Sequence, residues 1–456
     1  MRMTKKISFV LGLLLVASLL LAACSPAATP TQAPQPTVAQ QVEKPTTPPE
    51  PTKAPAASSE KIKVVIWTAY GKQLAPAVEA YNKKMVAEGK NIEVSGTELS
   101  FDSLSDKFAI ALTTGDVPDI LDLDLVLAPM FTSKNAMLDI TDRVKATGMD
   151  KDFNPKFMDL GVWNGKIYMI PFSADVSVLF YNKDLFKKAG LDPEKTPETW
   201  EELRADLLKI RDAKLTTDAG QPVYAYATSN GPGGKMFCDM PFVWTNGGNW
   251  LDDQGQVIMD SPESYAGMKF LSDLMNVDKL IPPNPSSYSW DDKMNMFYGG
   301  QVGVACSGSY TLAEVKDRAP NLNYGVFLFP HPEGKGSSSS FIGGDVIGIP
   351  VASKHPEEAW DFIQYALTEP IQVDVWAKSG MPPVRESLTK NKYFDAEPRY
   401  YVFSDGVKNG QCPKTIYYNE LYVPWYTAWE EMFTNEKPLD QTLKEAADGM
   451  RKIVSK

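Results

Sequence analysis

The sequence predicts an α/β fold in which helices cover a parallel sheet. Short segments rich in β-branched residues alternate with longer segments whose apolar residues recur every three or four positions. Glycines and prolines separate the two kinds of segment. Because a helix between two strands acts as a crossover connection, this alternation favours parallel strands with helices packed on the sheet.

The first predicted strand covers residues 63–67. A helix follows it, carries Leu74, Val78, Tyr81 and Met85 on one face, and ends at Gly89. Further strands are expected at 92–94, 119–125, 174–181 and 341–349, a hairpin at 163–168, and further helices at 101–112, 182–189, 200–210 and 357–366. Residues 251–255 predict a hairpin turn rather than a calcium loop, because the later bidentate Glu is missing.

Composition excludes several classes of function. The chain has 456 residues, of which 43% are hydrophobic and 11% aromatic, so it is too apolar for a disordered protein. Its formal net charge of −11 disfavours nucleic-acid binding. Two histidines and four cysteines make a zinc cluster or a His-based triad hard to build. We therefore expect no metal site, no cofactor and no nucleic-acid partner.

The first 59 residues predict an export signal and a tether. Basic residues at the start precede the apolar run 7–23, which closes on Leu21-Ala22-Ala23-Cys24 and resembles a bacterial lipobox. Residues 1–23 are thus interpreted as a signal peptide, Cys24 as a lipidated residue, and 24–59 as a proline-rich linker. An uncleaved membrane anchor is the alternative. Either reading places the rest of the protein outside the cytoplasm, held on the cell membrane and facing the extracellular or periplasmic side.

Polar and aromatic residues follow two of the predicted strands. Thr68 and Tyr70 come at the end of the first strand, and Asp124 at the end of the strand at 119–125. Ligands of open parallel sheets bind at the carboxyl ends of strands. The sequence therefore predicts that these three residues contribute to a binding site.

A series of short motifs follows in one order along the chain. The segments are Gly115–Ile120, Gly165–Pro171, Leu179–Phe186, Trp244–Gly248, Gly300–Val304, Gly308–Tyr310, Phe341–Asp345 and Ser379–Arg385. Behind a lipobox and a proline-rich linker, this order resembles the extracellular solute-binding proteins of ABC importers. Within these it is similar to the sugar-binding family that includes maltodextrin- and glycerol-phosphate-binding proteins, from about Lys61 to the C-terminus.

The resemblance implies a two-lobed periplasmic-binding-protein fold of type II, with three hinge crossings. The crossings are expected near Phe172–Asp175, near Ile342–Asp345 and somewhere in 385–410. The N-terminal lobe would then comprise 60–173 plus about 343–395, and the C-terminal lobe 174–342 plus about 396–456.

The resemblance also implies individual ligand contacts. Asp175 matches a sugar-binding carboxylate, Tyr310 and Trp425 match aromatic plates, and Phe237 would be a third plate. A sugar site needs such rings for the C–H faces of the sugar and polar groups for its hydroxyls. Asp124 stands where maltodextrin-binding proteins carry a different group of residues, which disfavours a maltodextrin ligand.

Three residues of the segment 343–345, and one more distant arginine, complete the candidate site. Gly343 and Gly344 allow a close approach of backbone to ligand, with hinge flexibility as the alternative. Asp345 could accept hydrogen bonds from hydroxyls. Arg385 could donate to hydroxyls or to an acidic group, with a surface ion pair as the alternative.

Three cysteines remain after Cys24, and one disulfide among them allows three pairings. Cys238 and Cys306 both lie near expected cleft residues, so this pair is favoured over those with Cys412.

The function predicted from the sequence is that of a monomeric, non-enzymatic substrate-binding lipoprotein. It would capture an extracellular carbohydrate and deliver it to the transmembrane subunits of an ABC permease. The alternatives are an extracellular carbohydrate-active enzyme and a binding protein for a non-sugar solute such as a polyamine or a metal ion.

Overall fold

The first of two main sheets holds the strands predicted near the N-terminus. In the computed structural model, which describes residues 60–435 and 437–456, its strand order is β2, β1, β3, β11, β6. The bounds are β1 (Ile62–Thr68), β2 (Ile92–Glu98), β3 (Ile120–Asp124), β6 (Met169–Val176) and β11 (Ile342–Gly348). The first three strands are parallel, as predicted, whereas β11 runs antiparallel to both β3 and β6.

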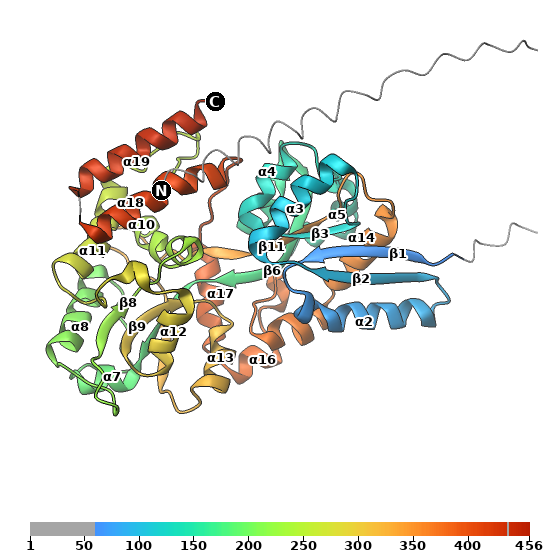
Figure 1. Ribbon diagram of the computed structural model, residues 1–456. Helices are drawn as coiled ribbons and strands as arrows, with labels where there is room; N and C mark the ends of the chain where they lie inside the picture. The colour runs from blue at the N-terminus through green and yellow to red at the C-terminus, as the bar shows by residue number, and fades with distance from the viewer. Residues whose placement is uncertain (1–59, 436) are drawn as a thin grey trace, which may run out of the picture. The chain divides into compact units, whose positions relative to one another are not determined.

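Helices pack on this sheet through the apolar faces that the sequence predicts. Helix α2 (Gly71–Ala87) buries Leu74, Ala77, Tyr81 and Met85, and lies along β1 and β2 (Figure 1). Helix α3 (Phe101–Thr114) ends at Gly115, whose φ of 79° is a left-handed conformation that glycine adopts without strain. Helix α14 (Pro356–Ala366) packs against α2, where the hydroxyl of Tyr81 donates a hydrogen bond to Asp361.

The second sheet has the order β10, β7, β9, β8. Its strands are β7 (Val178–Asn182), β8 (Tyr224–Ala227), β9 (Val302–Ser307) and β10 (Tyr324–Phe327). Strand β7 pairs antiparallel with both β10 and β9, and β8 pairs parallel with β9. The molecule is thus a two-lobed α/β protein, with one main sheet in each lobe.

A single strand was predicted for residues 174–181, and this prediction is wrong. The segment splits at Ser177 into β6, which belongs to the first sheet, and β7, which belongs to the second. The hydroxyl of the buried Ser177 accepts a hydrogen bond from the backbone N–H of Phe341. The chain therefore crosses between the sheets at Ser177, beside the point where β11 begins.

Gly344 shows why glycine is needed at this crossing. Its φ is 109°, and a Cβ atom there would lie 2.2 Å from the backbone oxygen of Ser173 on β6. The position thus combines a backbone conformation that side chains disfavour with a close approach of two strands.

The remaining elements are mostly helices. The Asn164-Gly165 hairpin joins β4 (Val162–Trp163) to β5 (Lys166–Ile167), as predicted. The other α-helices are α4 (Ala128–Thr132), α5 (Thr141–Thr147), α6 (Pro155–Leu160), α7 (Lys183–Lys188), α8 (Trp200–Asp212), α9 (Pro232–Gly234), α10 (Met240–Trp244), α11 (Pro262–Asn276), α12 (Trp290–Tyr298), α13 (Thr311–Arg318), α15 (Glu369–Ile371), α16 (Lys392–Ala396), α17 (Tyr400–Asn409), α18 (Tyr418–Thr434) and α19 (Leu439–Val454). Short helical segments are η1 (Leu125–Leu127), η2 (Met149–Lys151), η3 (Lys235–Asp239), η4 (Pro285–Ser287), η5 (Gln372–Trp376), η6 (Ala377–Ser379) and η7 (Glu386–Leu388).

Helices α18 and α19, drawn in red in Figure 1, pack against each other and against α11. Across the described ranges, no helix has both the length and the apolar character needed to cross a bilayer. The predicted signal peptide, the lipid attachment at Cys24 and the proline-rich linker all lie outside the described residues.

Candidate functional site

A cavity of about 330 Å³ combines residues from both lobes. Asp124 ends β3 and Asp175 lies near the end of β6, both in the first sheet, whereas Tyr310 follows β9 of the second sheet. The lining residues are Asp124, Val126, Asp175, Gly233, Met236, Phe237, Trp290, Tyr310, Phe341 and Tyr418. The cavity therefore brings four predicted site residues together, namely Asp124, Asp175, Phe237 and Tyr310.

Two of the larger surface grooves lack these features. One of about 790 Å³ runs along α2 and β2, and no aromatic ring is among its lining residues within the described chain. The other, of about 1150 Å³, is lined mainly by polar loop residues, and its single ring belongs to Trp250, which is 1% exposed. A small organic ligand needs apolar surface together with a few convergent polar groups, so the smaller cavity is the better candidate.

Asp175 is held by backbone amides beside the second sheet. The N–H of Val176 donates to its Oδ1 at 2.9 Å, and that of Ser309 at a longer 3.4 Å. A Cβ on Gly308 would lie 2.6 Å from the same oxygen, so the turn after β9 needs glycine to approach the carboxylate. Burial, with a smaller contribution from the charge of Asp124, raises the pKa of Asp175 to about 7.

Asp124 is fixed in a similar way at the end of β3. Its Oδ1 accepts a hydrogen bond of 3.1 Å from the N–H of Val126, which caps the short helix η1. Burial raises the pKa of Asp124 to about 6, although this hydrogen bond lowers it. Both carboxylates of the cavity thus have one oxygen bound to backbone.

More carboxylates lie behind Asp124. Asp345 pairs with Asp124 in the β11–β3 register, and Asp122 precedes it on β3. The hydroxyl of Thr68 donates to Asp122, and that of Ser173 donates to Asp345 at 3.1 Å. Burial first, and then the charges of Asp122 and Asp124, raise the pKa of Asp345 well above its ordinary value.

Three other residues predicted for the site lie at this edge of the sheet, outside the lining of the cavity. Thr68 and Asp345 are buried under the lining instead of forming it, because each is engaged by a neighbouring strand. Tyr70 is half-buried, and the plane of its ring is nearly perpendicular to that of Trp376, with the ring centroids 5.7 Å apart. None of the three residues is among the lining residues of the cavity.

An aromatic wall faces the carboxylates. Five rings belong to the lining, those of Phe237, Trp290, Tyr310, Phe341 and Tyr418. The ring of Phe237 contacts two of the others: its centroid lies 5.4 Å from that of Phe341 and 5.9 Å from that of Trp290. Edge-on and tilted contacts of this kind fix ring orientation while leaving faces available.

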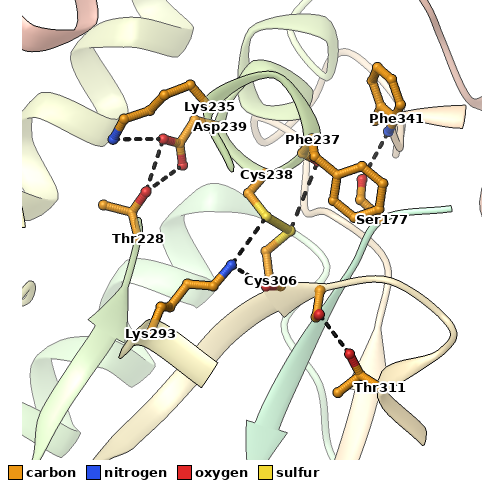
Figure 2. The surroundings of a disulfide bond; sticks show 11 residues. Ser177, Thr228, Lys235, Phe237, Cys238, Asp239, Lys293, Cys306, Thr311 and Phe341 are labelled. Carbon is orange, nitrogen blue, oxygen red and sulfur yellow. Dashed lines mark hydrogen bonds and ion pairs between the residues drawn. A yellow bond between two sulfur atoms is a disulfide. The ribbon is translucent and has the colours of Figure 1, made fainter. Parts of the chain in front are cut away.

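A disulfide joins Cys238 to Cys306 beside Phe237, one of the rings of this wall (Figure 2). It confirms the pair favoured from the sequence, and Cys412 is free. The bond ties η3, which carries Phe237, to β9, which leads to Tyr310. Two rings of the wall are thereby attached to one covalent link.

Lys293 connects a third ring of the wall, that of Trp290, to the disulfide through non-covalent contacts. Its ammonium nitrogen donates to the backbone oxygen of Cys306 at 2.8 Å and lies 3.5 Å from the centroid of the Trp290 ring. Burial lowers the pKa of Lys293 to about 7. Figure 2 shows that this lysine reaches the disulfide from the side opposite to Phe237.

Trp425 does not line the cavity, so the plate predicted there is corrected. The residue is 0% exposed on α18, and its ring packs between Trp250 and Trp429, with centroid distances of 5.4 and 6.0 Å. Its spacing of four residues from Leu421 and from Trp429 places all three on the buried face of the helix.

Arg385 and the two glycines are also outside the lining. Arg385 Nε donates to Asp152 at 2.7 Å, which is the ion pair considered as the alternative. Gly343 and Gly344 pair with β6, so their close approach is to protein backbone. For Asp124, Asp175, Phe237 and Tyr310, contact with a ligand stays a prediction.

Sequence reasoning missed three of the five rings. Trp290 begins α12, Tyr418 begins α18, and Phe341 immediately precedes β11. Only Phe341 had a usable signal, since it starts the motif Phe341–Asp345 and directly precedes the hinge crossing expected near Ile342–Asp345.

Comparison with known proteins identifies the family. Residues 67–373 match the family described as bacterial extracellular solute-binding protein, and the chain belongs to it. The arabinooligosaccharide-binding protein of Bacillus subtilis (strain 168) is 28% identical over 331 residues, or 70% of this chain and 73% of that protein. The sn-glycerol-3-phosphate-binding periplasmic protein UgpB of Salmonella typhimurium (strain LT2) is 26% identical over 376 residues, or 74% and 80%.

Solved structures agree with the fold. The sugar-binding protein MalE from Xanthomonas citri superposes with a TM-score of 0.76 at 20% identity, covering 86% of this chain and 97% of that one. The cyclic alpha-maltosyl-1,6-maltose binding protein from Arthrobacter globiformis gives 0.74 at 23% identity, covering 86% and 99%. The two-lobed fold of solute-binding proteins, predicted from the motif order, is confirmed.

Proposed function

We propose that this chain captures a carbohydrate in the cavity between its lobes and delivers it, without turnover, to the permease of an ABC importer. The observation that carries this proposal is a cavity in which two carboxylates of the first sheet, Asp124 and Asp175, meet five aromatic rings, among them that of Tyr310, which follows a strand of the second sheet. Rings cover the C–H faces of a sugar, and carboxylates accept hydrogen bonds from its hydroxyls. Among the relatives are an arabinooligosaccharide-binding protein and structures of sugar-binding proteins, which supports the proposal.

The test is binding without hydrolysis. Calorimetry of the purified chain against a panel of mono- and oligosaccharides should find at least one ligand with micromolar or tighter affinity. Chromatography of the same mixtures after long incubation should recover the sugar unchanged. Two carboxylates facing one cavity are also what a glycosidase requires. Release of shorter sugars that is lost in Asp175→Asn would therefore assign the alternative, an enzyme.

We also propose that the chain acts as a monomer held on the outer side of the cell membrane by a lipid on Cys24. The lipobox-like Leu21-Ala22-Ala23-Cys24 supports this, and residues 24–59 would give the binding domain reach. Mass spectrometry of protein extracted from its native membrane should show a mature chain that starts at a diacylated Cys24. A Cys24→Ala variant should instead keep its N-terminal segment, and an unmodified Cys24 in the native protein would refute the anchor.

The chain ranges of the lobes remain a proposal as predicted, with 60–173 plus about 343–395 in one lobe and 174–342 plus about 396–456 in the other. The membership of β11 in the first sheet and of β7 to β10 in the second supports this division, and the crossing at Ser177 moves the first boundary from 173/174 to 176/177.

A further inference from the structure

We infer that the cavity selects carbohydrates that carry an amine, with the ammonium group bound between Asp124 and Asp175. This inference rests on the proposed function and specifies the chemical class of its ligand. It comes from the charges around the cavity, which are of one sign.

The lining carries acids and no base. Asp124 and Asp175 are its charged residues, and none of its ten described members is Lys, Arg or His. Behind Asp124 lie two more buried carboxyl groups, those of Asp122 and Asp345, and burial favours the neutral form of both. Lys293 is nearby, but it lies against the ring of Trp290 and donates to Cys306, so it belongs to the support of the wall. A ligand in the cavity therefore meets a negative field with no protein cation in the lining.

Each lining carboxylate also has a second oxygen, Oδ2. Backbone N–H groups bind Oδ1 of Asp124 and Oδ1 of Asp175. These backbone donors do not engage Oδ2 of either side chain. Since a buried carboxylate without a counter-ion is unfavourable, a cationic ligand gains more in this cavity than it would in water.

The aromatic wall favours the same charge. The face of an aromatic ring is negative, so Phe237, Trp290 and Tyr310 attract a cation in the cavity that they line. The remaining hydroxyls and C–H faces of an amino sugar would still find the rings and acceptors of a sugar site. A phosphorylated or carboxylated sugar would instead place its negative charge beside two carboxylates, and should be excluded.

Matched pairs of sugars test this inference. The probes are glucosamine, galactosamine and mannosamine with their neutral parents, and β-1,4-linked glucosamine oligomers with the corresponding cello-oligosaccharides, together with glucuronate and glucose 6-phosphate. Within each pair of amine and parent, an ammonium replaces one hydroxyl. Calorimetry of the purified full chain should show at least one amine bound about tenfold tighter than its neutral partner, and no binding of the two acidic probes.

Several results would overturn the inference. If the neutral sugars bind and no amine gains about tenfold, the cavity does not select for charge, while the proposed function stands. If an acidic probe binds as tightly as its neutral parent, the inference is equally wrong. If no probe of either kind binds, both the inference and the proposed function fail.

Charge-removing variants locate the ammonium. Asp124→Asn and Asp175→Asn keep the size of the side chain, and each should reduce the ratio of amine to neutral affinity by about fivefold or more. Asp440→Asn, at an exposed position near the start of α19, is the matched control and should leave the ratio unchanged. If the ratio of amine to neutral affinity is unchanged in both cavity variants, the amine binds elsewhere, and the proposed site is refuted.

Discussion

Replacing Trp425 with Ala should lower the free energy of unfolding by about 3–5 kcal/mol. The side chain is 0% exposed, and its ring contacts those of Trp250, Tyr422 and Trp429. Truncation removes both the buried apolar surface and the contacts of three neighbouring rings, and the packing of α18 against α19 and α11 limits how far the helix can move to fill the gap. Urea unfolding followed by circular dichroism, with a constant slope, measures the change.

A valine on the same helix provides the control. Val423 is 63% exposed on α18, so Val423→Ala should change stability by no more than about 0.5 kcal/mol. The conservative Trp425→Phe should remain folded and retain its affinity for sugar within about twofold, because the ring does not line the cavity. A folded Trp425→Phe protein that has lost tenfold or more in affinity would restore Trp425 as a ligand contact.

The order of elements in the first sheet could be predicted because its signals are local. Apolar spacing on α2 and the left-handed position at Gly115 are each encoded within a few residues. The break at Ser177 could not be predicted in this way. Apolar residues continue through Val176 and Val178 on both sides, and only the pairing of β6 and β7 with different sheets ends the strand.

The carboxylates of the site could be predicted from the sequence, but most of the rings of its aromatic wall could not. Asp124 follows a buried strand, and strand ends are where ligands bind. A ring on a helix gives no comparable signal, because Trp425 in the core and Trp290 at the cavity are both aromatic residues of amphipathic helices. Their difference depends on which tertiary partner each face meets, and on the disulfide that places β9 beside η3.

The two aromatic plates expected to contact the sugar are therefore Tyr310 and Trp290, where the sequence predicted Tyr310 and Trp425. Tyr310→Ala and Trp290→Ala should each weaken carbohydrate binding by at least about 2 kcal/mol, or roughly thirtyfold in Kd. Each ring buries on the order of 150–250 Å² and removes a C–H face of the sugar from water without requiring a hydrogen bond in return. For a neutral sugar, a single hydroxyl-to-protein hydrogen bond contributes only about 0.5–1.5 kcal/mol net, since water offered one before binding.

A comparison of ring variants with a carboxylate variant tests whether a ring contributes more to the affinity than a single hydrogen bond does. With the tightest neutral sugar of the panel, Asp175→Asn should cost less than either ring, because the amide oxygen still accepts a hydrogen bond. Tyr393→Ala is the control, since this half-buried tyrosine donates to Asp374 and is not in the lining. If both ring variants fold normally and bind within threefold of the original chain, the sugar binds outside this cavity, because single hydrogen bonds to hydroxyls are too weak to replace the contribution of two rings.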